Sequence, residues 1–275
     1  MAVRTYPHGV PCWVDTEQPD VDAAARFYGR VFGWSFEDAM RPGEGRRYVI
    51  ATLHGEDVCG IAGPGGGTPH WNTYVSVDDA DAASARLASL GARIRSEPAD
   101  AGAAGRGAAL EDPEGAEIRL WQAGRRPGAQ AVNLPGGWNF SDLHTAAAPA
   151  AREFYAAGFG WLFVDLGFGT MIARPGYGDH LEATTDPDIR SRQLDVHTPV
   201  GFEDAIGWLA PAAPDEAPHW HVTFSVADRD AFVEDAVRLG ARVLAVDESE
   251  WTRSALVRDP QGAEFTASQF TPPSG

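Results

Sequence analysis

The segment Pro69-His70-Trp71-Asn72 returns as Pro218-His219-Trp220-His221, at an offset of 149 (218 − 69). Further along, Leu90-Gly91-Ala92-Arg93-Ile94 returns as Leu239-Gly240-Ala241-Arg242-Val243 at the same offset (239 − 90). Segments that recur in the same order at one offset indicate an internal duplication. The chain is therefore predicted to consist of two homologous halves.

Two further pairs of segments keep the same order. They are Asp112-Pro113-Glu114-Gly115-Ala116-Glu117 with Asp259-Pro260-Gln261-Gly262-Ala263-Glu264, and Phe27-Tyr28 plus Phe32-Gly33-Trp34 with Phe154-Tyr155 plus Phe159-Gly160-Trp161. Between the halves lies a segment rich in glycine and proline, which is typical of a linker. We predict a first domain at 1–124, a linker at 125–137 and a second domain at 138–275.

Composition restricts the classes of function. The chain has 275 residues, 44% of them hydrophobic, which is enough for two domains that each bury a core. Its net charge of −17 would repel phosphate backbones and anionic lipid, so neither nucleic acid nor a membrane is expected as a partner. The chain shows no long apolar run and no signal-peptide pattern, and Cys12 and Cys59 are too few for a disulfide scaffold. We therefore expect a cytoplasmic protein with free thiols.

Each half contains two units in which a helix follows the first strand and further strands follow the helix. In the first half the pattern predicts strands at 13–15, 47–53, 56–62, 73–77, 108–110 and 116–121, with helices after Asp20 and at 79–90. In the second half it predicts strands at 140–143 and 222–226 and helices at 149–157 and 228–239. The second half is longer by about 20 residues within 162–202. This insertion is interpreted either as a solvated loop or as a lid over a cavity.

The repeated Phe-Tyr-x-x-x-Phe-Gly-Trp and Asp-Pro-x-Gly patterns resemble the vicinal oxygen chelate superfamily. This superfamily includes glyoxalase I, bleomycin-resistance proteins and extradiol dioxygenases. The resemblance covers nearly the whole chain and implies an α+β fold with tandem βαβββ units. Two glyoxalase-like domains, each with a U-shaped mixed sheet around a cavity, are expected from it. In metal-dependent members the first and last strands of the units carry the metal ligands.

The resemblance also places the family's ligand positions in this chain. They fall at Trp13, Asn72 and Arg119 in the first half and at Phe140, His221 and Thr266 in the second. A fourth position in each half falls around 59–61 and 206–208, where no carboxylate is in register. A divalent metal needs three or four converging nitrogen, oxygen or sulfur donors, which neither set supplies. We therefore predict no family-type metal and no other cofactor. A divalent metal remains the alternative, if His180, His197 or Glu264 were recruited as ligands.

Strand alternation places aromatic and polar residues together on the faces expected to line each cavity. The predicted ligand-binding residues are Trp13, Asp15, Asn72, Tyr74, Arg119, Phe140, His180, Thr223 and Thr266. His221 and Asp142 are the candidate catalytic bases, because both side chains can transfer protons. Ordinary core packing is the alternative for the aromatic residues and for His221. A buried ion pair is the alternative for Asp15 with Arg119.

These observations predict a protein that binds a small aromatic or polycyclic metabolite in a sheet-lined cavity. It would act in specialised metabolism or drug tolerance. The alternative is an enzyme, either a metal-independent isomerase, lyase or cyclase or a divalent-metal enzyme of the glyoxalase or dioxygenase type. A third possibility is that only the second domain is active. The sequence leaves the oligomeric state open.

Overall fold

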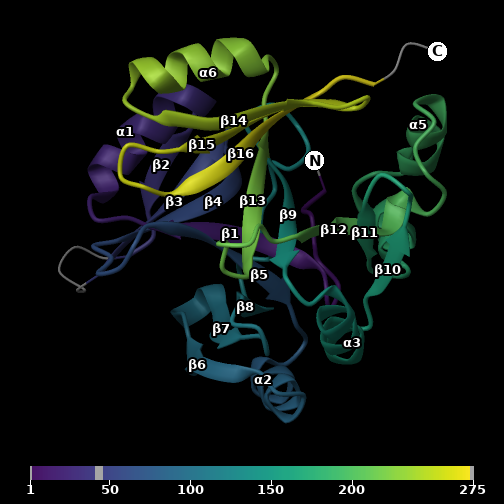
Figure 1. The fold of residues 1–275 in the computed structure, drawn as a ribbon. Helices are drawn as coiled ribbons and strands as arrows, with labels where there is room; N and C mark the ends of the chain where they lie inside the picture. Colours follow the sequence, from purple (N-terminus) through teal and green to yellow (C-terminus); the bar gives the residue numbers. More distant parts are fainter. Residues whose placement is uncertain (1, 41–45, 273–275) are drawn as a thin grey trace. The chain divides into compact units, whose positions relative to one another are not determined.

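The computed structural model describes residues 2–40 and 46–272. Within these residues each half of the sequence contributes one eight-stranded mixed sheet (Figure 1). The strand orders are β2-β3-β4-β1-β5-β8-β7-β6 and β10-β11-β12-β9-β13-β16-β15-β14. The two orders are the same when eight is added to each strand number. The predicted α+β fold with tandem βαβββ units is therefore confirmed.

The elements of the first half are β1 (Pro11–Glu17), α1 (Val21–Phe32), β2 (Ser35–Asp38), β3 (Arg47–Leu53), β4 (Glu56–Gly63), β5 (His70–Ser76), α2 (Ala80–Ser89), β6 (Arg93–Asp100), η1 (Gly102–Ala104), β7 (Gly105–Glu111) and β8 (Glu117–Ala123). Those of the second half are β9 (Trp138–Thr145), α3 (Ala148–Phe159), β10 (Leu162–Asp165), β11 (Thr170–Ala173), α4 (Tyr177–Thr184), α5 (Ile189–Asp195), η2 (Phe202–Asp204), β12 (Ala205–Pro211), β13 (His219–Ser225), α6 (Arg229–Arg238), β14 (Arg242–Glu248), β15 (Thr252–Arg258) and β16 (Glu264–Phe270).

Helix α1 shows how the sequence sets the element boundaries. The Asp20 side chain accepts a hydrogen bond from the Ala23 N–H, which satisfies one of the first backbone donors of the helix. The helix ends at Gly33, whose φ of 76° is the left-handed conformation that glycine adopts without strain. After the helix the chain returns as β2, β3 and β4, and β4 pairs in parallel with β1. The first strand of the unit therefore lies inside the sheet.

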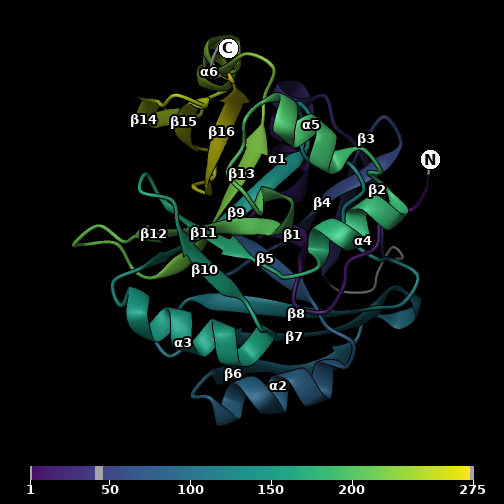
Figure 2. The same cartoon turned by 90° about the vertical axis from the view of Figure 1, so that its right-hand side faces the viewer.

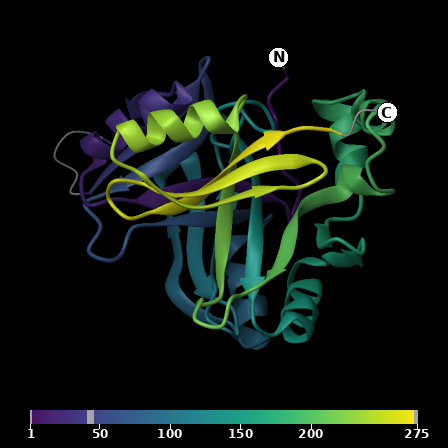
Figure 3. The same cartoon turned by 45° about the horizontal axis from the view of Figure 1, so that its top comes forward.

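The chain folds into two compact units, and neither unit coincides with one half of the sequence. Compact unit 1 contains the described residues of 1–12, 73–128 and 141–220, and compact unit 2 those of 13–72, 129–140 and 221–275. Each compact unit therefore combines one βαβββ unit from each half. Helices α2 and α3 are in contact in compact unit 1 (Figure 2), and α1 and α6 are in contact in compact unit 2 (Figure 3).

The two repeated motifs explain why each compact unit draws on both halves. In compact unit 2, the Tyr28 hydroxyl donates a hydrogen bond of 2.7 Å to Asp259. In compact unit 1, the Tyr155 hydroxyl donates one of 3.0 Å to Asp112. The tyrosine of the Phe-Tyr motif in one half thus binds the aspartate of the Asp-Pro-x-Gly motif in the other half. The four side chains are buried, so these bonds lie within the cores.

The insertion of the second half lies between β11 and β12 and is largely helical. It forms α4 and α5, and Tyr177, Leu181 and Ile189 are buried in the core of compact unit 1. The interpretation as a solvated loop is therefore wrong. The physical reason is the spacing of Tyr177 and Leu181, which places two apolar side chains on one face of a helix that can pack. The lid interpretation stays a prediction.

Two expectations about the whole chain can be compared with the described residues. Across 2–40 and 46–272, none of the helices combines the length and the apolar character needed to cross a bilayer. Cys12 and Cys59 are free, as predicted, and the structure shows that both are buried. Burial raises the pKa of both thiols, so neither is a reactive thiolate at neutral pH.

Candidate functional site

A buried polar cluster surrounds Asp15 on strand β1 in compact unit 2. Asp15 is 1% exposed, and its carboxylate accepts hydrogen bonds from the Asn72 amide at 2.8 Å and the Tyr48 hydroxyl at 3.0 Å. The Tyr48 oxygen in turn accepts a bond of 2.9 Å from the Trp13 indole N–H. Three predicted ligand-binding residues therefore meet at Asp15, which Asn72 contacts directly and Trp13 reaches through Tyr48. Sequence reasoning missed Tyr48, because nothing in the spacing of β3 indicates that it reaches β1.

Gly60 makes the position of Tyr48 possible. Gly60 is the register partner of Asp15 in the parallel β1–β4 pair. A Cβ atom at Gly60 would lie 2.0 Å from the Tyr48 hydroxyl oxygen, which is far inside van der Waals contact. Any larger residue at this position would therefore displace the Tyr48 ring and separate it from Asp15.

Gly60→Ala is expected to lower the free energy of unfolding by about 1–3 kcal/mol, because the Tyr48–Asp15 hydrogen bond inside the sheet is lost. Urea denaturation measures this loss. The same substitution in a Tyr48→Ala background should cost much less, because the clash is gone. Gly66→Ala serves as a control, since nothing lies within 4 Å of its Cβ position. Equal costs of Gly60→Ala in both backgrounds would contradict the argument.

Asp142 on β9 is the candidate base in compact unit 1. One carboxylate oxygen accepts a hydrogen bond of 3.1 Å from the Trp208 backbone N–H. Burial raises the pKa of the Asp142 carboxyl from 3.8 to about 7, because the single N–H bond offsets only part of the loss of hydration. The side chain keeps partial exposure. A carboxyl group with this pKa exchanges its proton readily at neutral pH.

Trp208, whose ring contacts two further aromatic side chains, lies on the same face of the sheet as Asp142. Leu143 and Leu209 are register partners with buried side chains, so the preceding residues, Asp142 and Trp208, share the opposite face of the sheet. The rings of Phe168 and Phe202 lie 6.0 Å and 6.2 Å from the Trp208 ring. Phe168 is 67% exposed, so the cluster presents apolar surface to solvent. This combination of a carboxyl group and aromatic surface suits a flat, partly polar ligand.

The remaining predicted residues lie in small hydrogen-bonded groups. Within compact unit 1, the Arg119 guanidinium donates hydrogen bonds to the Glu117 carboxylate at 2.8 Å and to the Tyr74 hydroxyl oxygen at 3.0 Å. Its guanidinium carbon also lies 5.5 Å from the centre of the Tyr74 ring. Asp15 belongs to compact unit 2, and its predicted ion pair with Arg119 stays a prediction.

In compact unit 2, His221 Nε2 lies 2.8 Å from the Thr266 hydroxyl. Thr266 is the register partner of Thr223 in the parallel β13–β16 pair, so these three candidates are neighbours. Phe140 on β9 also belongs to compact unit 2 and is partly exposed. The roles of His221 as a base and of the other residues as ligand contacts stay predictions.

His180 lies on α4 in the insertion. Its Nε2 atom lies 3.0 Å from the Thr5 carbonyl oxygen and 3.1 Å from the Thr5 hydroxyl, so it contacts the N-terminal segment. Sequence reasoning also missed Trp208 and Phe202. Little in the sequence indicated these two residues, because both follow the insertion. The insertion interrupts the alignment of the two halves by counting residues.

The residues at the family's ligand positions do not fit a divalent metal. The Trp13 indole N–H is a donor without a lone pair, and Arg119 is a cation held by Glu117. In the second half, Phe140 has no donor atom, and the single imidazole of His221 is hydrogen-bonded to Thr266. One imidazole and one hydroxyl are fewer ligands than such a metal requires.

Comparisons with known proteins agree with this fold. Residues 18–120 match the Glyoxalase/Bleomycin resistance protein/Dioxygenase superfamily, and residues 140–268 match a glyoxalase-like domain. The chain is 35% identical over 274 residues to "Putative glyoxylase CFP32" of Mycobacterium bovis, covering 97% of each chain. It is 33% identical to "Anthracycline biosynthesis protein DnrV" of Streptomyces peucetius, covering 95% of this chain and 93% of the relative. The chain therefore belongs to the glyoxalase/bleomycin resistance/dioxygenase superfamily.

A solved structure shares the fold at lower identity. The Mn(II)-bound glyoxalase from Novosphingobium aromaticivorans aligns with a TM-score of 0.60 at 16% identity. The alignment covers 95% of this chain and 82% of that one. At this identity the likeness shows the fold alone.

Proposed function

We propose that this protein binds a small aromatic or polycyclic metabolite through the face of compact unit 1 that carries Asp142 and Trp208. The observation that carries the proposal is that the carboxyl group of Asp142 shares a sheet face with Trp208, whose ring contacts Phe168 and Phe202. Flat aromatic ligands gain contact area by stacking on such rings, while one polar group fixes their orientation. Within compact unit 2, Trp13 and Phe140 are proposed separately as ligand contacts.

The names of relatives support the polycyclic class. Two Streptomyces relatives, at 33% and 34% identity, are named as anthracycline biosynthesis proteins, and anthracyclines are polycyclic aromatic compounds. We propose that binding does not use a metal at the family's ligand positions, because three of them are occupied by Trp13, Arg119 and Phe140, which supply no metal ligand. A role in specialised metabolism or drug tolerance follows from this ligand class.

Trp208→Ala is expected to weaken the binding of quinizarin, a dihydroxyanthraquinone, about 10–50-fold through loss of stacking surface. Titration calorimetry on the full chain measures the affinity, with EDTA present because hydroxyanthraquinones chelate metals. Trp251→Ala is the matched control. Trp251 stacks on Phe270 at 6.3 Å, within compact unit 2. The proposal fails if quinizarin does not bind saturably, or if both variants lose affinity equally.

A second candidate function is proton transfer on the bound ligand, which would make the protein a metal-independent isomerase, lyase or cyclase. The observation that favours it is the pKa of Asp142 of about 7, which suits a general base at neutral pH. Deuterium exchange at acidic carbon positions of a polycyclic ketone, followed by NMR, distinguishes the two functions. Binding without exchange supports sequestration, whereas exchange that Asp142→Asn abolishes supports catalysis.

We propose the cytoplasm as the site of action and a small molecule as the partner. The net charge of −17 disfavours nucleic acid and anionic membranes, and the two thiols are free. Fractionation of cells that produce the full chain tests the location. Recovery with membranes or nucleic acid would contradict the proposal.

A further inference from the structure

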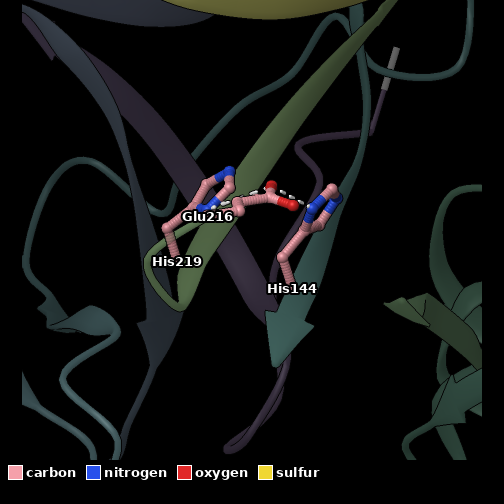
Figure 4. A group of neighbouring side chains, drawn as sticks. All are labelled: His144, Glu216 and His219. Carbon is pink, nitrogen blue, oxygen red and sulfur yellow. Dashed lines mark hydrogen bonds and ion pairs between the residues drawn. The ribbon is translucent and has the colours of Figure 1, made fainter. Parts of the chain in front are cut away.

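His144, Glu216 and His219 form a cluster in compact unit 1 that the proposed function does not use (Figure 4). His144 lies at the end of β9, Glu216 in the loop before β13, and His219 at the first position of β13. The ligand atoms of the three side chains lie within 4.8 Å of one another. Figure 4 shows the Glu216 carboxylate between the two imidazole rings.

The Glu216 carboxylate bridges the two rings at short range. His144 Nδ1 lies 2.6 Å and His219 Nδ1 3.7 Å from the same oxygen, Glu216 Oε1. The centres of the two rings are 4.7 Å apart. The side chains are 24%, 29% and 40% exposed for His144, Glu216 and His219, respectively. The cluster is thus accessible from solvent yet held close together.

We propose that His144, Glu216 and His219 bind one divalent transition-metal ion of the zinc class. Two imidazoles and one carboxylate are the ligand set of many zinc sites, with water in the fourth position. Tetrahedral bonds of about 2.0–2.1 Å place ligand atoms roughly 3.3 Å apart, so modest side-chain rotations bring these atoms into place. None of the three residues occupies a ligand position of the family, and the metal would join β9, the loop and β13.

The backbone already orients two of the ligands. The Ala213 N–H donates a hydrogen bond of 2.8 Å to the second Glu216 oxygen. His219 Nδ1 lies 3.0 Å from the Ala217 carbonyl oxygen, which can only accept, so this nitrogen carries the proton. A neutral His219 therefore has its lone pair on Nε2. Such hydrogen bonds to the non-ligating atom are typical of metal-binding histidine.

The first half of the chain provides an internal comparison. His70 occupies the position of His219 and makes the same backbone contact, with Nδ1 3.0 Å from the Thr68 carbonyl oxygen. The loop before it is Gly65-Gly66-Gly67-Thr68-Pro69 and carries no acid, and Glu17 stands where the second half has His144. Glu17 forms an ion pair with Arg46 at 2.5 Å. The three-ligand set is therefore a property of the second half.

The test is zinc binding by the full chain after treatment with EDTA and dialysis. Calorimetric titration with Zn²⁺ at neutral pH is expected to give one ion per chain with a Kd in the micromolar range or tighter. Glu216→Gln and His144→Ala should each weaken this Kd at least about 10-fold. His70→Ala is the matched control and should leave the Kd unchanged. Cobalt substitution should give visible absorption typical of tetrahedral coordination in the wild type and not in Glu216→Gln.

Each result bears directly on the proposal. Absence of saturable zinc binding would overturn it, as would stoichiometric binding with the same Kd in Glu216→Gln and His144→Ala. Thermal unfolding shows that each variant is folded, and zinc should raise the Tm of the wild type and of His70→Ala only. Quinizarin binding is measured in EDTA, so failure of either proposal leaves the other intact.

Discussion

Replacing Asp142 with asparagine is expected to stabilise the protein increasingly as the pH rises. Relative to the wild type, the free energy of unfolding of Asp142→Asn should increase by about 2 kcal/mol between about pH 5 and about pH 8. Urea denaturation at several pH values measures this difference. The substitution keeps the size and shape of the side chain, so packing changes little.

The sign follows from the pKa of the carboxyl group in the two states. In the unfolded chain the group titrates near 3.8, and in the folded protein burial raises its pKa to about 7. Between these values the unfolded state releases the proton while the folded state retains it, so the wild type loses stability as the pH rises. Above about 7 both states are ionised and the loss is constant. Because the Asp142 side chain is partly exposed, the change in the free energy of unfolding is smaller than the full shift in its pKa would give.

Asp165→Asn is the control for this experiment. Its carboxyl lies on the surface, and hydrogen bonds from Arg152 and Thr170 lower its pKa below 3.8. Removing that charge should not stabilise the protein at any pH. A pH-independent difference between Asp142→Asn and the wild type would contradict the argument. Weaker quinizarin binding by Asp142→Asn in the same buffers would link the destabilising carboxyl to the ligand.

The duplication predicted two homologous halves, and the resemblance to the superfamily implied their tandem βαβββ units. Local signals such as the Asp20 cap and Gly33 set the helix ends. The compact units were not predicted, because they depend on hydrogen bonds between Tyr28 and Asp259 and between Tyr155 and Asp112. Such contacts join residues of opposite halves, and spacing along the chain carries no signal for them.

Residues of the candidate site were predictable only where the alternation of side chains along a strand showed which face of the sheet they occupy. Trp13, Asp15 and Asn72 were selected because they share faces expected to line a cavity, and they meet in one cluster. Tyr48 joins this cluster because its ring lies against Gly60, a contact that a sequence pattern does not encode. Glu216 lies in the loop before β13. The conformation of a loop does not follow the alternation of side chains by which the strand residues were selected. The cluster in Figure 4 therefore emerged only in three dimensions.

Asp259→Ala is expected to lower the free energy of unfolding by about 3–5 kcal/mol, because Asp259 anchors a buried network. One carboxylate oxygen accepts the N–H groups of Gln261, Gly262 and Ala263 at 2.7–2.9 Å. The other accepts the Gln18 amide at 2.9 Å and the Tyr28 hydroxyl at 2.7 Å. Removing the carboxylate leaves these donors without their acceptor inside the core.

Two further variants separate this network from a general effect of substitution. Tyr28→Phe removes one hydrogen bond and keeps the ring, so a loss of about 1–2 kcal/mol is expected. Asp247→Ala changes an exposed strand residue and should change the free energy of unfolding by less than about 0.5 kcal/mol. Chemical denaturation followed by circular dichroism measures all three. A loss below about 1 kcal/mol in Asp259→Ala would show that the repeated aspartate does not hold the two halves of the sequence together in compact unit 2.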